Sequence, residues 1–161
     1  MKMISYHHHR SIFDFNYGVL CHAVNCRGKM GAGLALEMRN RFPEAYKEYM
    51  NDFKSGFNQL GNITVVNVAP SLYIAHLYTQ YNYGRDKRYT DYDAMEKCFK
   101  KLKGWKEIIQ REAPGQTFPV YIPYKIGCSL GGGDWAVVEK LISKTFNTTP
   151  VNIVSKFGAG S

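Results

Sequence analysis

Apolar and polar positions alternate in blocks along this chain, and the spacing within each block predicts either a strand or a helix. Short apolar or β-branched runs bounded by Gly, Pro or Asn are typical of buried strands. Six such runs occur, at residues 2–6, 18–24, 62–69, 73–79, 119–123 and 151–157. Pro70 closes the third run, and the fourth follows so soon that we expect the two to form a hairpin.

Longer segments carry apolar residues every three or four positions, which predicts amphipathic helices. Four segments have this spacing, at residues 34–42, 43–53, 93–112 and 135–146. Pro43 suits the first position of the second helix, and Asp134 suits the N-cap of the last. Gly104 weakens the long third helix locally, because glycine is a poor helix former.

Strands and helices alternate in the second half of the chain, and a hairpin lies in the middle. This order favours an α/β fold with a mixed sheet and helices on both faces. The chain has 161 residues and shows no repeat, low-complexity run or long linker. We therefore expect one domain over residues 1–161.

The formal net charge of +8 favours anionic partners, which include phosphates, nucleotides and nucleic acid, without choosing among them. No apolar stretch is long enough to span a bilayer, and the first ten residues lack the apolar region of a secretory signal. We expect a cytoplasmic protein without a membrane partner. Its cysteines form no C-x-x-C pair, so we expect free thiols and no zinc site: Cys21, Cys26, Cys98 and Cys128.

Two Gly-rich segments each stand between a buried strand and a helix. They are NCRGKMGAG at residues 25–33 and YKIGCSLGGGD at residues 124–134. Glycines let backbone N–H groups converge on an anion, and the start of a helix adds a favourable dipole. Two such loops at one sheet edge would suit a diphosphate. Neither has the spacing of a Walker A motif or of a dinucleotide-binding fingerprint.

The stretch CHAVNCRGKMGAGLA resembles the macro-domain signature, and IPYKIGCSLGGGDW resembles the second phosphate loop of that family. The resemblance follows the element order along nearly the whole chain. It is nearest to the branch of ADP-ribose 1″-phosphate phosphatases and terminal ADP-ribose glycohydrolases. It implies a macro-domain-like three-layer α/β/α fold with a mixed central sheet. It also implies a small nucleotide partner, ADP-ribose or a derivative, with no metal and no cofactor.

The resemblance assigns substrate-binding roles residue by residue. Asn25 matches the asparagine that hydrogen-bonds the distal ribose. The backbone around the diphosphate and distal ribose corresponds to Gly31, Ala32 and Gly33. The loop around the distal phosphate corresponds to Ser129, Leu130, Gly131, Gly132 and Gly133.

Two positions depart from the family pattern. Many macro domains carry Gly-Asp after the first strand, where the Asp reads the adenine amino group. Here that dipeptide corresponds to Arg10–Ser11, which makes Ser11 the candidate substrate-binding residue, and Asp14 follows a few residues later. Some glycohydrolases of this branch carry a catalytic Asp where this chain has Gly131.

Three residues are candidate catalysts, and each has a structural alternative. His22 could act as acid or base near neutral pH, or could be a structural histidine. Strict strand alternation places it on the face opposite Asn25, unless the strand end twists. Asp91 could activate a water or cap the long helix, and Asp134 has the same two alternatives.

Other charged and polar residues near these candidates leave two interpretations open. A basic run before Asp91 holds a terminal phosphate or forms a solvated loop: Arg85, Lys87 and Arg88. His7 and His9 would share a strand face, yet no third ligand has a suitable spacing, so no metal site is predicted. Cys128 has no fixed base partner, which disfavours a nucleophilic role.

The first hypothesis for function is a hydrolase that removes the phosphate of ADP-ribose 1″-phosphate. One alternative is an ADP-ribosyl hydrolase acting on modified protein or nucleic acid. Another is a non-catalytic ADP-ribose reader, or a sponge for a nucleotide signal. A fourth, less favoured, is an RNA-binding module that stacks bases on an aromatic loop: Tyr78, Tyr81, Tyr83, Tyr89 and Tyr92.

Overall fold

Six strands form one mixed sheet in the computed structural model, which describes residues 3–158. The strands are β1 (Ile4–His7), β2 (Gly18–Asn25), β3 (Ile63–Ala69), β4 (Leu72–Gln80), β5 (Val120–Pro123) and β6 (Val151–Val154). Their order across the sheet is β1-β6-β5-β2-β4-β3. All neighbours are parallel except β3 and β4, which form the predicted hairpin. All six predicted strands are present, although the last ends at Val154, and Lys2 lies outside the described residues.

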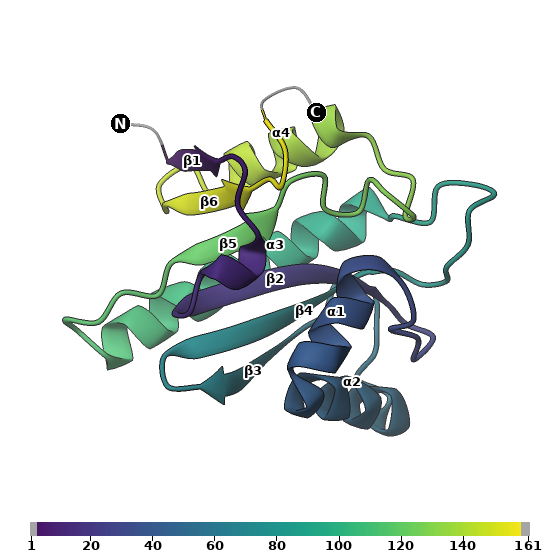
Figure 1. Cartoon of the computed structure of the whole chain (residues 1–161), viewed down its shortest axis with the longest axis horizontal. Helices are drawn as coiled ribbons and strands as arrows, with labels where there is room; N and C mark the ends of the chain where they lie inside the picture. Colours follow the sequence, from purple (N-terminus) through teal and green to yellow (C-terminus); the bar gives the residue numbers. More distant parts are fainter. Residues whose placement is uncertain (1–2, 159–161) are drawn as a thin grey trace.

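Helices cover both faces of the sheet, which confirms the three-layer α/β/α prediction (Figure 1). They are α1 (Gly33–Arg41), α2 (Pro43–Ser55), α3 (Tyr92–Glu112) and α4 (Trp135–Thr145). Pro43 opens α2 as expected. A short 3-10 turn, η1 (Ile12–Asp14), was not predicted, because three residues are too few to show a period. No helix within residues 3–158 combines the length and apolarity needed to cross a membrane.

The side chains of β2 divide between two cores. Val19 and Cys21 are fully buried against the layer of α3 and α4. Leu20 and Val24 are buried in the opposite core, beneath α1 and α2. A strand buried on both faces needs no alternation of polar and apolar residues, which explains the continuous apolar run in its sequence.

The two Gly-rich loops leave neighbouring strands at the same edge of the sheet. Strands β2 and β5 are parallel and adjacent, with Val19 opposite Val120 and Leu20 opposite Tyr121. Their carboxyl ends, and that of β4, therefore point the same way, and the connections that follow gather at the right of Figure 1. This is the edge at which α/β folds bind ligands.

We expect Gly104→Ala to raise the free energy of unfolding by about 0.5–1 kcal/mol. Gly104 lies inside α3, and a Cβ added there would meet no heavy atom within 4 Å. Gly56→Ala is the matched contrast, because Gly56 has equal space but a φ of 82° that disfavours a side chain. Urea denaturation of both variants measures the difference, and a gain at Gly56 or a loss at Gly104 would contradict it.

Candidate functional site

Asn25 shapes the first Gly-rich loop with its own side chain. Its Oδ1 accepts from the backbone N–H groups of Arg27 at 3.0 Å and Lys29 at 3.4 Å, while Nδ2 donates to the Lys29 carbonyl at 2.8 Å. The Tyr49 hydroxyl of α2 lies 2.7 Å from the Asn25 carbonyl oxygen and 3.0 Å from Oδ1. The amide is therefore held rigidly at the end of β2, and one Nδ2 hydrogen remains for a ligand.

The rest of this loop presents bare backbone at the start of α1. Ala32 is the N-cap, and its side chain caps no N–H group of the helix. The unpaired N–H groups of a first turn attract anions. A Cβ added at Gly31 or Gly33 would meet no heavy atom within 4 Å, so both residues border open space. This geometry suits the approach of a phosphate.

The second Gly-rich loop is folded back on itself. Gly133 N–H donates to the Gly127 carbonyl at 2.9 Å, and Gly132 N–H donates to the Ser129 carbonyl at 3.2 Å. At its tip, the N–H groups of Ser129, Leu130 and Gly131 donate to no acceptor among the described residues. The tip therefore offers three adjacent donors to an anion.

Thr90, which sequence reasoning did not select, pins this second loop. Its hydroxyl donates to the Gly127 carbonyl at 2.7 Å, and its N–H donates to the Gly131 carbonyl at 3.0 Å. A Cβ at Gly131 would lie 2.5 Å from Thr90 Oγ1 and 2.7 Å from the Gly127 oxygen. Position 131 has no room for a side chain here, which gives a steric reason for the missing Asp.

The connection from β4 to α3 joins the two loops. At one end, Cys26 N–H lies 3.1 Å from the carbonyl oxygens of both Gln80 and Tyr81. At the other end, Thr90 holds Gly127 and Gly131. The structure thus brings residues 25–33 and 127–133 to one edge, linked by a segment of about ten residues that touches both.

Asp91 caps α3 and also faces a hollow. Its Oδ1 accepts from Ala94 N–H at 3.0 Å, so the capping alternative is confirmed. Its Oδ2 accepts no hydrogen bond from the described residues, which leaves that oxygen for water. The hollow has a volume of about 310 Å³ and is lined by Asp91 together with Leu60, Tyr81, Asn82, Lys87, Arg88 and Tyr89.

Asp134 is the N-cap of α4, as its sequence position predicted. Its Oδ1 accepts from Ala136 N–H at 2.9 Å, and its own N–H donates to the Tyr92 hydroxyl. The side chain is exposed, and it does not line the hollow beside Asp91. Capping accounts for every contact that this carboxylate makes with the described residues.

His22 lies in the core beneath α2, away from the open edge. Its side chain is 1% exposed, and Nε2 lies 2.7 Å from His76 Nδ1. His76 Nε2 lies 2.8 Å from the Ala45 carbonyl oxygen, so it carries the hydrogen and leaves Nδ1 to accept from His22. Burial, reinforced by His76, holds the pKa of His22 well below its usual range. These contacts favour the structural alternative for His22.

His22 and Asn25 do not lie on opposite faces of the sheet, because β2 is irregular at its end. Pairing between β2 and β4 shifts after Val24, so that Asn25 faces Gln80 and Thr79 is passed over. This irregularity turns the Asn25 side chain to the same side as His22, where it meets Tyr49 of α2. Side chains alternate between the two faces only where the strand pairing is regular, and it is irregular at this point.

We expect stability to fall as the pH drops from about 6.5, the ordinary pKa of an unfolded histidine, toward 4. Burial lowers the pKa of His76 to about 4 and that of His22 as well, so the unfolded chain binds more protons across this window. Within this window, each imidazole that stays neutral in the folded state lowers the free energy of unfolding by about 1.4 kcal/mol for each unit by which the pH falls. Urea denaturation at several pH values measures the slope. His8→Gln, at an exposed histidine, should leave it unchanged, and a flat profile would contradict the buried pair.

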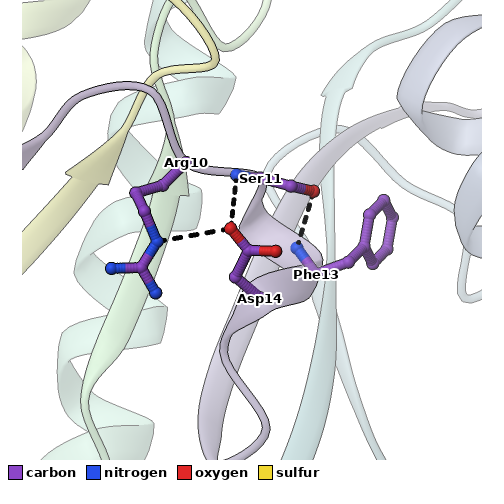
Figure 2. Close-up of polar contacts among 4 residues, drawn as sticks. All are labelled: Arg10, Ser11, Phe13 and Asp14. Carbon is purple, nitrogen blue, oxygen red and sulfur yellow. Dashed lines mark hydrogen bonds and ion pairs between the residues drawn. The ribbon is translucent and has the colours of Figure 1, made fainter.

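Ser11 is engaged in the turn that follows β1 (Figure 2). Its hydroxyl accepts from Phe13 N–H at 3.1 Å, while Asp14 Oδ2 accepts from Ser11 N–H at 3.0 Å and from Arg10 Nε at 3.3 Å. In the turn after β1, the carboxylate is therefore supplied by Asp14. Phe157, whose carbonyl accepts from His9 N–H, is 63% exposed beside this turn.

The remaining candidate residues do not come together in a common site. His7 bonds Asn152 at 2.9 Å, whereas His9 lies beyond β1 with a φ of 57°, so the two do not share a strand face. Residues 3–158 contain no group of three or more His, Cys, Asp or Glu side chains arranged to hold a metal ion. Burial raises the pKa of the Cys128 thiol to about 11, which disfavours a thiolate nucleophile.

A family profile described as Macro domain matches residues 21–142, which include both Gly-rich loops and the segment between them. The chain belongs to the macro domain family. The resemblance of the two loop sequences to this family is thereby confirmed, and so is the expected fold.

Individual macro-domain relatives carry two different activities in their names. The ADP-ribose 1″-phosphate phosphatase of Meyerozyma guilliermondii is 33% identical over 78% of this chain and 83% of its own length. The DNA ADP-ribosyl glycohydrolase of Mycobacterium tuberculosis is 27% identical over 81% of this chain, but over only 35% of its own length. The solved macrodomain of Mycobacterium tuberculosis DarG superposes with a TM-score of 0.77 at 23% identity, covering 95% of this chain and 97% of that one.

Proposed function

We propose that this macro domain binds ADP-ribose and hydrolyses a substituent of the distal ribose, first of all the phosphate of ADP-ribose 1″-phosphate. One observation carries the proposal. Two loops with free backbone donors follow the adjacent parallel strands β2 and β5, and the segment 80–91 joins them. Two such sets of donors at one sheet edge suit a diphosphate.

In this proposal the diphosphate lies on the backbone of Gly31 and Gly33, and Asn25 meets the distal ribose. The N–H groups at the tip of the second loop, residues 129–131, stabilise charge on the substrate phosphates. Lys87 and Arg88 line the adjoining hollow and supply positive charge near the terminal phosphate of the substrate.

Asp91 is the proposed general base. Its free Oδ2 takes a proton from a water that attacks the phosphorus. The bond between phosphorus and the 1″ oxygen breaks, and that oxygen takes a proton from solvent water as it leaves, which yields inorganic phosphate and ADP-ribose. Asp91 then returns its proton to solvent. Asp134 stays a second candidate for this role, although its exposure and distance from the hollow favour Asp91.

Phosphate removal is preferred to glycoside cleavage for two reasons. Gly131 has no room for the acidic side chain that some glycohydrolases place there. In addition, the phosphatase relative matches this chain over most of both lengths, whereas the glycohydrolase relative is matched over only 35% of its own length.

Two measurements together test the proposal. Isothermal titration with ADP-ribose should show saturable binding at one site, and incubation with ADP-ribose 1″-phosphate should release inorganic phosphate. Binding without release would make the chain a reader or sponge. Absence of both would remove the nucleotide site altogether, and strong salt-dependent RNA affinity in that case would favour the RNA-binding alternative.

A second candidate, an ADP-ribosyl hydrolase acting on modified nucleic acid, is favoured by the surface beside Asp91. Tyr81 is 58% exposed there, and the Arg27 guanidinium lies 6.0 Å from the centre of its ring. Exposed aromatic and basic groups suit single-stranded nucleic acid. Release of free ADP-ribose from a modified oligonucleotide, with no release from a modified glutamate peptide and none of phosphate, would select this candidate.

A further inference from the structure

A second hollow, of about 290 Å³, lies on the α4 side of the sheet, away from the hollow beside Asp91. Its walls are mostly aromatic, and five lining side chains carry its chemistry: Tyr6, His8, Tyr124, Trp135 and Glu139. They come from β1 and the residue after it, from the segment after β5, and from the first two turns of α4. No part of the proposed nucleotide site uses these side chains.

The four rings of this lining form two pairs. Tyr124 and Trp135 meet edge to face, with ring centres 5.0 Å apart and planes inclined at 63°. Tyr6 and His8 are stacked, with ring centres 6.2 Å apart and an angle of 10° between their planes. Tyr6 is 42% exposed, so its ring faces open space as well as protein. The hollow therefore presents several ring surfaces to whatever enters it.

Among residues 3–158, Glu139 supplies the only carboxylate of this lining, and no Lys or Arg side chain lines it. The Tyr6 hydroxyl donates to Glu139 Oε2, which fixes the carboxylate, while Oε1 accepts no hydrogen bond from the described residues. Three carboxylates of the described residues are paired with cations, namely Asp14 with Arg10, Glu96 with Lys100 and Lys144, and Glu37 with Lys156. Glu139 has no such partner within residues 3–158.

The two hollows differ in the charge of the side chains that line them. That hollow is lined by Lys87 and Arg88 and suits an anion, whereas this one combines rings with a fixed negative charge. The nearest cation recorded at these rings, Lys125 Nζ, lies 5.5 Å from the centre of the Tyr124 ring. An ammonium group at this distance is within the range of a cation–π attraction to the ring.

We infer that this hollow binds an alkylated ammonium cation. The negative faces of aromatic rings attract such a group, and its methyl groups fill apolar space that a hydrated inorganic ion would leave empty. The carboxylate of Glu139 balances the positive charge. The cation could belong to a free quaternary ammonium compound or to a methylated lysine of another protein. The inference does not depend on the proposed hydrolase activity.

The test uses Trp135 as its own reporter. The chain has two tryptophans, so Trp105→Phe leaves the fluorescence of Trp135 alone. Choline and a trimethyl-lysine peptide are titrated separately, with 3,3-dimethylbutan-1-ol as the neutral analogue of choline and the unmethylated peptide as its counterpart. We expect a saturable change with the ammonium ligands, and binding of the neutral analogue weaker by about tenfold or more.

Variants locate the response. Glu139→Gln should weaken binding about fivefold, and Tyr124→Leu by about tenfold, because each removes one source of attraction. Tyr83→Leu, at an exposed tyrosine in a different connection, should leave binding unchanged. Should Tyr124→Leu fail to fold, two measurements still locate the binding site. One is the affinity of Glu139→Gln, and the other is a ligand-induced shift of the Trp135 indole NMR signal, but not of the Trp105 signal, in the unmodified chain.

Each outcome is informative. Binding of both ammonium ligands supports the shared chemistry, and binding of the peptide alone assigns the cation to a protein partner. Binding of choline alone assigns it to a free compound. An absence of saturable change through the millimolar range, or an equal response to the neutral analogue, would overturn the inference even if ADP-ribose still binds normally.

Discussion

Asp91→Asn is expected to slow phosphate release from ADP-ribose 1″-phosphate by about 10²–10⁴-fold while leaving ADP-ribose affinity nearly unchanged. Asn cannot take a proton from water, yet it caps a helix about as well as Asp does. The cap bond to Ala94 N–H therefore survives, and folding is preserved. Rates come from a single-turnover phosphate assay, and affinity comes from titration with ADP-ribose.

Two companion variants separate catalysis from folding. Asp93→Asn changes an exposed carboxylate two residues further into α3 and should leave turnover intact. Asp91→Ala should lose about 1 kcal/mol of stability in addition to activity, because the cap is removed. Full turnover in Asp91→Asn would exclude Asp91 as the base and would turn attention to Asp134, tested in the same way.

Gly31→Glu is expected to weaken ADP-ribose binding by about 100-fold or more, which corresponds to about 2.7 kcal/mol. The added Cβ meets no heavy atom within 4 Å, so the chain should fold normally. The carboxylate would then occupy the space assigned to the diphosphate and repel its charge. Titration calorimetry measures the affinity, and thermal unfolding checks that the fold is kept.

Gly104→Glu is the matched control, because Gly104 also has open space but lies in α3, remote from the sheet edge. It should bind ADP-ribose as the unmodified chain does. Gly131 is unsuitable for the same test, since an added Cβ would lie 2.5 Å from Thr90 Oγ1 and would disturb the loop itself. Unchanged affinity in Gly31→Glu would mean that the first loop does not meet the ligand.

Local sequence signals predicted most of the elements in this chain. Apolar runs and helical periods record which side chains each element must bury, and this information lies within a few neighbouring residues. Asp134 shows the strength of such signals, because an Asp before an apolar helix is a cap wherever the helix packs. The two Gly-rich loops were recognisable for the same reason.

Long-range packing governed the candidates that local signals left open. His22 is in the core because α2 closes over it and His76 comes from a neighbouring strand, 54 residues away in sequence. Asn25 faces α2 because one residue of β4 is passed over in the pairing. Thr90 matters only because the fold lays it against a glycine that stands 41 positions later. None of these neighbours can be inferred from spacing along the chain.

The sequence by itself determined the order of strands and helices, the caps, and the two loops able to surround phosphates, because each depends on short-range periodicity and backbone preference. Only the tertiary structure decided which residues meet at the edge. Strands β2 and β5 are about a hundred residues apart in sequence yet lie side by side in the sheet. That adjacency buries both faces of β2. Many other strand orders would also bury both faces, so the apolar pattern of the sequence does not specify this one.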